Sequence, residues 1–258
     1  MARQSGKFGA YVVGEPSRLL VRSRLEGSRR RQIFGGLAGA ELVRSKIALE
    51  VRLGNLTPGD RLPDAGVISQ ALEVGEITVR RALETMGQDG LLERRRGRAG
   101  GTFLAEQWDV VVAAMQDDHQ AAQLVDFQLV LECGFAARAC GEVEPDDLAV
   151  LAEYLKSTEA EFESGSYARA DAHFHLALAT VLGGWRARER QSDLLGKLCL
   201  LLPKPPMRVA REQNLAHAQL LSGLASGSIE IAIEAVKRHA RCWPVTIGTK
   251  SVEIFVTE

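Results

Sequence analysis

Three short amphipathic segments followed by a hairpin pattern lie between residues 41 and 104, and this order constrains the fold more than any other feature. Helices are predicted over residues 41–53, 64–72 and 76–88, because each segment carries apolar side chains at helical spacing and ends near a glycine or turn. Asp64 is a suitable N-cap for the second helix. A helix, a tight turn and another helix predict a helix-turn-helix.

The segment after the third predicted helix has the pattern of a two-stranded wing. Residues 91–104 contain an extended stretch, a glycine-bearing loop crowded with arginine and a second extended stretch. The sequence therefore predicts a winged helix-turn-helix domain over residues 39–104.

Charge is divided unevenly along the chain. Residues 1–104 carry 18 Lys and Arg against 11 Asp and Glu, whereas residues 105–258 carry 14 against 22, so the halves have net charges of +7 and −8. A basic half suggests that this half binds a polyanion. The simpler alternative is that uneven solvated charge has no such role.

A third helix seated in the major groove of DNA would place polar side chains against base edges and phosphates. Arginine can bind guanine through two hydrogen bonds, and threonine suits a phosphate or a thymine methyl group. Wing arginines can follow the phosphate backbone or enter the minor groove. The candidate DNA contacts are Arg61, Thr78, Arg80, Arg81, Arg94, Arg95, Arg96 and Arg98. For each arginine the alternative is an exposed, solvated charge.

The second half of the chain is predicted to be entirely helical, which gives a mainly α fold class of a winged helix-turn-helix plus an all-α bundle. Helical periodicity continues from about residue 107 to residue 243 with breaks at Pro145, Gly165, Gly183 and Gly184, among others. The chain is predicted to begin with a basic disordered tail (residues 1–38), followed by the DNA-binding domain (39–104) and a connection (105–120). The all-α domain (121–243) and a C-terminal tail or short strand (244–258) complete the predicted divisions.

Histidines in the helical half form a candidate metal site. Asp171 and His175 are spaced i, i+4, which places them on one face of one helix, and His217 and His239 belong to later helices. An Asp and several imidazoles that converge inside a bundle would bind a divalent metal, with Zn or Ni favoured. By spacing alone, solvated or core histidines remain the alternative.

The N-terminal half resembles the DNA-binding domain of GntR-type transcriptional regulators. The resemblance covers residues 39–104 and is carried by four stretches, residues 56–63, 74–83, 90–97 and 101–103. Two positions depart from the family pattern, because Gly66 and Glu76 stand where the family usually has arginine. A carboxylate at position 76 is repelled by phosphate but can accept a hydrogen bond from cytosine.

The C-terminal half resembles the ligand-binding domain of the FadR-like branch of the same family. Residues 171–179, 215–227 and 232–239 carry this resemblance, and the metal ligands that it implies are Asp171, His175, His217 and His239. His173 is expected to point away from them. The branch often has an arginine for a ligand carboxylate where this chain has Gln128, which suggests a neutral ligand or another cation. Arg138 is a candidate substitute, and both residues are expected at the effector pocket.

The combined expectation is a homodimeric transcriptional regulator that binds double-stranded DNA and an effector, an organic acid or a similar molecule, near a divalent metal. Four cysteines without CxxC spacing and no apolar run of about 20 residues predict a cytoplasmic protein with no membrane segment. Catalysis is not expected, since no acid–base pair accompanies the metal ligands. The alternatives are a metal-dependent hydrolase or lyase, and an architectural DNA binder with inert histidines.

Overall fold

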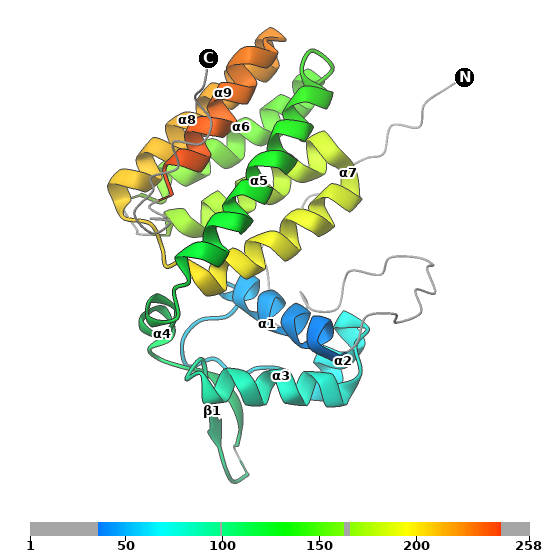
Figure 1. Ribbon diagram of the computed structural model, residues 1–258, viewed down its shortest axis with the longest axis vertical. Coiled ribbons are helices and arrows are strands. Elements are labelled where there is room, and N and C mark those ends of the chain that lie inside the picture. Colours follow the sequence, from blue (N-terminus) through cyan, green and yellow to red (C-terminus); the bar gives the residue numbers. More distant parts are fainter. Residues whose placement is uncertain (1–35, 99, 163–165, 244–258) are drawn as a thin grey trace, which may run out of the picture.

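The computed structural model describes residues 36–98, 100–162 and 166–243. Its described part consists of helices and one two-stranded sheet, arranged as a small N-terminal unit below a larger helical bundle (Figure 1). The fold is therefore mainly α, as the sequence predicted. The predicted break at Gly165, the C-terminal tail and all but the last three residues of the basic tail lie outside the described residues.

The N-terminal unit is a winged helix. Strands β1 and β2 pair antiparallel, with Leu92 opposite Leu104 and Arg95 opposite Gly101. Apolar faces of the three helices bury Val43, Ile47, Ile68, Val79 and Met86 in one core, which the hydrophobic effect stabilises. The elements in chain order are α1 (Gly36–Arg52), α2 (Ala65–Leu72), α3 (Glu76–Gln88), β1 (Leu92–Arg95) and β2 (Gly101–Leu104).

In this unit one predicted helix start was wrong, and one predicted N-cap residue lies in place without its side-chain hydrogen bond. Helix α1 begins at Gly36 rather than at residue 41, so residues 36–38 are helical and do not belong to a disordered tail. Asp64 occupies the N-cap position of α2 but makes no side-chain capping hydrogen bond. Its carboxylate lies 3.4 Å from the guanidinium of Arg61 instead.

The C-terminal half is a helical bundle, and no strand occurs among its described residues. The predicted connection over residues 105–120 contains a short helix, whose Trp108 and Val112 pack on the core of the winged helix. Gly184 has φ 78° and bends the long α7, which explains the break predicted there. The elements are α4 (Trp108–Ala114), α5 (Asp118–Ala139), α6 (Pro145–Ala160), α7 (Tyr167–Leu201), α8 (Met207–Ser226) and α9 (Ile229–Arg241).

Helix α1 joins the two units because it packs against α7 on one side and against α3 on the other (Figure 1). The backbones come close at Gly196, where a Cβ atom would lie 2.3 Å from the Ser45 carbonyl oxygen. Leu49 packs with Leu176 and Leu195 of α7. The interface is therefore tightly packed.

Membrane-spanning helices are absent from the described part of the chain, where every helix is too short or too polar to cross a bilayer.

Candidate DNA-reading surface and metal centre

Helix α3 presents its polar face outward. Arg80 and Arg81 are exposed, and Thr78 is half-buried at the N-terminal end of the helix. Arg80 is held by Glu76 one turn earlier, with Nη2 2.5 Å and Nε 3.0 Å from the Glu76 carboxylate. The unexpected Glu76 thus orients Arg80 along the helix and competes with any phosphate or base for its guanidinium.

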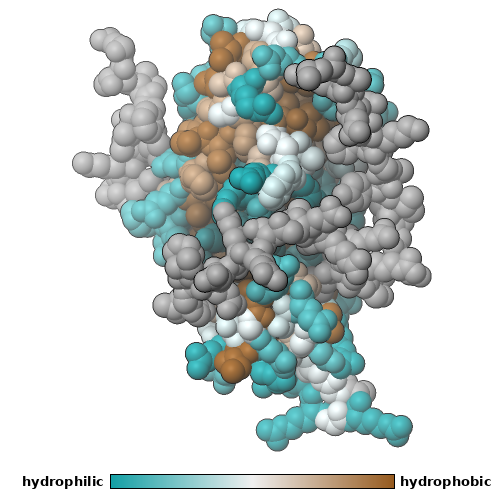
Figure 2. Space-filling model, turned by 90° about the vertical axis from the view of Figure 1, so that its right-hand side faces the viewer, coloured by the Kyte–Doolittle hydropathy of each residue, from teal (hydrophilic) through white to brown (hydrophobic). Residues whose placement is uncertain are grey.

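The wing is basic and exposed. Arg94, Arg95, Arg96 and Arg98 are all exposed, and the Arg95 guanidinium lies 4.2 Å from the centre of the Phe103 ring. Arg61 lies at the base of the wing, where its backbone bridges to Phe103. Figure 2 shows a hydrophilic tip at the lower end of the molecule, where the wing projects, and apolar surface over the upper, helical part.

Asp171, His175, His217 and His239 converge inside the bundle. Their ligand atoms all lie within 4.8 Å of one another, although the residues come from α7, α8 and α9. His175 Nε2 lies 3.7 Å from one Asp171 oxygen, and His217 Nδ1 lies 3.9 Å from the other. The three imidazoles are at most 3% exposed. The i, i+4 spacing on α7 brings Asp171 and His175 together, and the packing of α8 and α9 in the bundle adds His217 and His239.

This cluster fits a divalent metal. Buried ring nitrogens of His175, His217 and His239 have no hydrogen-bond partner among the described residues. Unpaired buried nitrogen is unfavourable, and three imidazoles with one carboxylate form a donor set typical of Zn or Ni. The same atoms would be satisfied by an ion at their centre.

Glu132 of α5 belongs to the candidate metal site, and the sequence interpretation missed it. Its Oε1 lies 2.7 Å from His175 Nδ1, and the side chain is 3% exposed. Gln128 and Gln191 also donate to this oxygen. A carboxylate on Nδ1 leaves Nε2 free to bind a metal. The only sequence signal was the i, i+4 spacing of Gln128 and Glu132.

Burial and neighbouring charge separate the pKa values of the three imidazoles. Burial lowers the pKa of His175, but the carboxylates of Glu132 and Asp171 outweigh burial and raise it to about 9. Burial and the charge of His175 lower the pKa of His239 to about 4. Burial and the neighbouring histidines hold the pKa of His217 well below its ordinary value. Two imidazoles are therefore neutral at pH 7, as metal ligands must be.

The pKa of the Glu132 carboxyl group is lowered by the same contact that raises the pKa of His175. Burial alone would raise the pKa of its carboxyl group, but the charge and hydrogen bond of His175 outweigh burial and lower it. Glu132 is therefore an ionised carboxylate inside the bundle.

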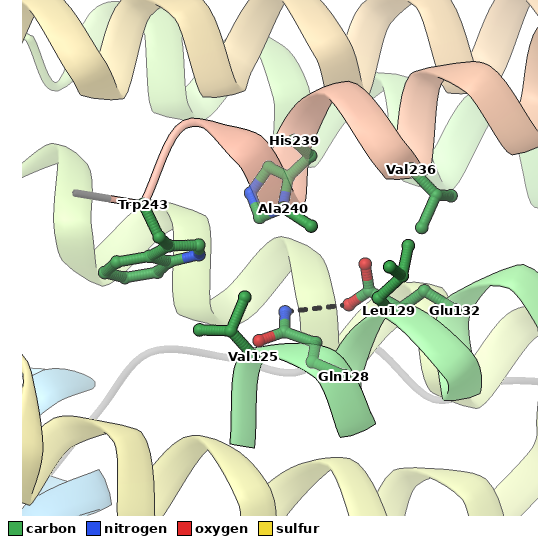
Figure 3. A pocket seen from close by; sticks show the side chains of 8 residues that line it. All are labelled: Val125, Gln128, Leu129, Glu132, Val236, His239, Ala240 and Trp243. Atoms are coloured by element: carbon green, nitrogen blue, oxygen red, sulfur yellow. Dashed lines mark hydrogen bonds between the residues drawn. The ribbon is translucent and has the colours of Figure 1, made fainter. Parts of the chain in front are cut away.

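Two hollows border the cluster. One is a narrow hollow between α5 and α9, lined by Gln128, Glu132 and His239 together with apolar side chains (Figure 3). The other, also narrow, is lined by Asp171, Tyr167 and Gln213 with their neighbours.

The two expected effector-pocket residues are placed differently. Gln128 lines the hollow between α5 and α9. Arg138 lines neither hollow, because its guanidinium donates to the Leu182 carbonyl oxygen at 2.7 and 3.1 Å. His173 lies outside the metal cluster, stacked on Tyr154 and hydrogen-bonded to the backbone of Leu53.

Two protein families match the chain. The bacterial regulatory proteins of the gntR family match residues 40–103, and the FCD domain matches residues 123–241. Together they cover more than half of the chain, which therefore belongs to the GntR family of transcriptional regulators and carries an FCD effector-binding domain. Its domains and relatives are those of regulators rather than enzymes.

Two curated relatives agree with this assignment. LutR of Bacillus subtilis, an HTH-type transcriptional regulator, is 32% identical over 50% of this chain and 61% of its own. The repressor NanR of Salmonella newport is 22% identical over 87% of this chain and 92% of its own. The solved structure of E. coli McbR/YncC covers 79% of this chain and 93% of its own, with 20% identity and a TM-score of 0.49.

Proposed function

We propose that this regulator is a homodimer that reads an operator with α3 and the wing, and that an organic acid or a similar small effector acts on it through a divalent metal. The observation that carries the proposal is the buried cluster of Asp171, His175, His217 and His239, two of which lie on α7, the helix that packs on α1 of the DNA-binding unit.

Asp171, His175, His217 and His239 would hold the metal, with Zn or Ni favoured by the imidazoles. When bound, the ion supplies a Lewis acid for oxygen atoms of the effector. Glu132 holds the ring of His175, and Gln128 and Gln191 hold Glu132. The bundle excludes water around these groups, since all but Asp171 are nearly fully buried.

The DNA-binding surface consists of Thr78, Arg80 and Arg81 on α3 and of arginines on the wing and at its base, namely Arg61, Arg94, Arg95, Arg96 and Arg98. Lysine and arginine that neutralise phosphates release counterions and bind duplex DNA in a salt-dependent way. The Glu76 carboxylate fixes the direction of Arg80 and accepts from cytosine or water. We therefore expect an operator that differs from those of regulators with arginine at this position.

Helix α1 is the proposed path from the metal site to DNA. Leu176, the neighbour of His175, packs on Leu49 of α1, and α1 in turn is paired with the end of α3 through Arg44 and Asp89 at 2.6 Å. An effector that binds differently to two arrangements of α7 would shift the position of α3 by this path.

A dimer is supported by the outer face of α5. Phe127 and Val130 are 48% and 66% exposed, and the exposed Gly134 and Ala137 continue the same stripe at alternating spacings of three and four residues. Two copies of such a stripe can pack against each other as in a coiled coil. A dimer also provides two α3 helices for two half-sites.

The test is selection of bound sequences from a random DNA pool with the full chain and with Arg80→Ala. We expect one enriched, two-fold symmetric sequence for the parent chain and a changed or lost preference for the variant. No enrichment for the parent would contradict specific operator binding. In parallel, His175→Ala combined with His217→Ala should abolish stoichiometric metal, and full occupancy in that variant would remove these residues as ligands.

A further inference from the structure

The first turn of α3 carries a large apolar side chain on its outer surface. The exposed large apolar side chains among the described residues of the winged helix are Ile77, at 69%, and Val67 of α2, at 45%. Helix α3 lies on the side of the winged helix that faces away from the bundle (Figure 1). In a helix-turn-helix the N-terminal residues of the second helix contact base edges in the major groove. Ile77 therefore stands at the end of α3 that would meet the bases.

Thr78 cannot take the role of this apolar group. A Cβ atom at Gly39 of α1 would lie 3.0 Å from Thr78 Cγ2, so the threonine methyl group packs on α1. Thr78 can then offer DNA only its hydroxyl group, which suits a phosphate. Thymine is recognised in the major groove by apolar contact with its methyl group. Ile77 is thus the side chain in the first turn of α3 that can make this contact.

Glu76 and Arg80 leave one acceptor and one donor edge open. Both hydrogen bonds between them end on Glu76 Oε1, from Arg80 Nε and Nη2. Neither side chain makes another hydrogen bond to the described residues, so Glu76 Oε2 and Arg80 Nη1 are available. A Cβ atom at Gly66 would meet only Glu76 Oε2, at 3.9 Å. The glycine therefore leaves this oxygen uncovered.

A carboxylate beside a guanidinium matches a G·C base pair. In the major groove guanine presents the acceptors O6 and N7, and cytosine presents an amino donor. A carboxylate is repelled by phosphate, so it improves binding only where an amino donor faces it. Glu76 therefore acts as a selective group rather than a general DNA contact.

We propose that the N-terminal part of α3 selects a G·C pair beside a thymine. Arg80 donates to the guanine and Glu76 accepts from the cytosine amino group, while Ile77 packs on the methyl group of the thymine. Side chains of successive helical residues point about 100° apart, so Glu76 and Ile77 reach neighbouring base pairs. This inference rests on the proposed DNA-binding surface and names the bases that this surface prefers.

The test removes one chemical group at a time from the sequence that the full chain enriches from a random DNA pool. Uracil in place of the thymine lacks only the methyl group, and the dissociation constant should rise about fourfold, which equals about 0.8 kcal/mol. 2-Pyrimidinone in place of the cytosine lacks only the amino group, and the dissociation constant should rise about tenfold. Fluorescence anisotropy with labelled duplexes measures both changes.

The contact with the methyl group is assigned by a variant of Ile77. Ile77→Ser should bind the thymine and uracil duplexes equally, because no apolar group then faces the methyl group. Val110→Ser is the matched control, because Val110 is 65% exposed but lies on α4, outside the helix-turn-helix. This control should keep the fourfold difference.

The contact with the amino group is assigned by a variant of Glu76. Glu76→Ala should bind the cytosine and 2-pyrimidinone duplexes equally, because the carboxylate that accepts from the amino group is gone. The same variant should bind unrelated DNA about threefold more tightly than the parent chain, since a negative charge near the phosphates is removed and Arg80 is released. Misfolding cannot produce this gain.

The outcomes separate this inference from the proposed operator binding. If no sequence is enriched, specific operator binding is contradicted and this inference fails with it. If a sequence is enriched but holds no G·C pair beside a thymine, or if either altered base binds as well as the natural one, operator binding stands and this inference is wrong.

Discussion

At the scale of single residues, the same side chain has different chemistry at three neighbouring positions. His175 faces two carboxylates, which raise its pKa to about 9, whereas burial and the charge of His175 lower the pKa of His239 to about 4. The three rings cannot all be charged in one buried cluster. A metal would replace the proton of His175 and use the two rings that are already neutral.

The stability of the metal-free chain should therefore pass through a maximum near pH 6.5, the ordinary pKa of histidine in an unfolded chain. Because His239 is neutral when folded, stability falls as the pH drops from about 6.5 towards 4. Because His175 is charged when folded, its contribution is present below about pH 6.5 and is lost as the pH rises towards 9. Each of these two histidines should contribute a slope of about 1.4 kcal/mol per pH unit, and His217, whose pKa is also lowered, adds to the slope on the acid side.

The measurement is urea unfolding in the presence of a chelator from pH 4 to pH 9, for the parent chain, His239→Gln and His175→Gln. The difference in the free energy of unfolding between the parent chain and His239→Gln should change with pH below pH 6.5. The corresponding difference for His175→Gln should change with pH above pH 6.5. Parallel curves for all three proteins would contradict the assigned protonation states.

At the scale of elements, α1 is shared by the two halves of the molecule. It contributes Val43 and Ile47 to the core of the winged helix, and its other side contacts α7 through Leu49 and Lys46. A shift of α7 cannot be absorbed at Gly196, where the two backbones already touch. Displacement at the metal ligands is therefore expected to move α1 and α3 together.

Removing a polar contact between α1 and α7 should weaken this coupling. Lys46 Nζ lies 2.9 Å from Asp193 and donates to Ser192 at 2.7 Å. The coupling is measured by the ratio of the operator affinity with saturating Zn to the operator affinity without Zn. In Lys46→Met we expect this ratio to move about 3- to 10-fold closer to one, which is a change in coupling free energy of roughly 0.6–1.4 kcal/mol. Fluorescence anisotropy with labelled operator measures both affinities.

Arg241→Met is the control for this experiment, since Arg241 pairs with Glu234 on α9, away from α1. Its affinity ratio should match that of the parent chain. An unchanged ratio in Lys46→Met would show that coupling does not depend on this contact.

At the scale of the whole molecule, the outer face of α5 is complementary to itself. If two copies pack antiparallel about residue 132, Phe127 faces Ala137 of the other copy and Val130 faces Gly134. Each large side chain then meets a small one, and a Cβ atom at Gly134 would meet nothing within 4 Å in the single chain. An isologous dimer needs this kind of pairing.

Val130→Glu should therefore separate the proposed dimer. A carboxylate in the centre of the interface, present once in each copy, is expected to cost roughly 3 kcal/mol, which raises the dimer dissociation constant about 100-fold. Light scattering coupled to gel filtration measures the mass, and operator affinity should fall in parallel.

Val150→Glu, on the outside of α6, is the matched control, because Val150 is 47% exposed but lies outside the stripe. A Val130→Glu protein that remains dimeric would place the dimer interface elsewhere.

The sequence predicted the helix boundaries of the winged helix accurately where a turn residue stands at each end of the helix. Helix α3 spans residues 76–88 as predicted, because Gly75 and Gly90 enclose a single amphipathic run. The start of α1 was missed because the sequence before residue 41 has no capping residue followed by a regular apolar stripe. Asp171 and His175 could be paired from their spacing, but Glu132 could not be connected to His175 across 43 residues.

The sequence by itself determined which segments are helical, where the wing lies and which side chains are candidates for DNA and metal, because these properties depend on short-range periodicity, turn residues and charge. The tertiary structure alone decided that Glu132 holds His175 and that α1 connects the histidine cluster to α3. These contacts depend on how helices pack and on which rotamers fill the core, and neither can be read from residue spacing.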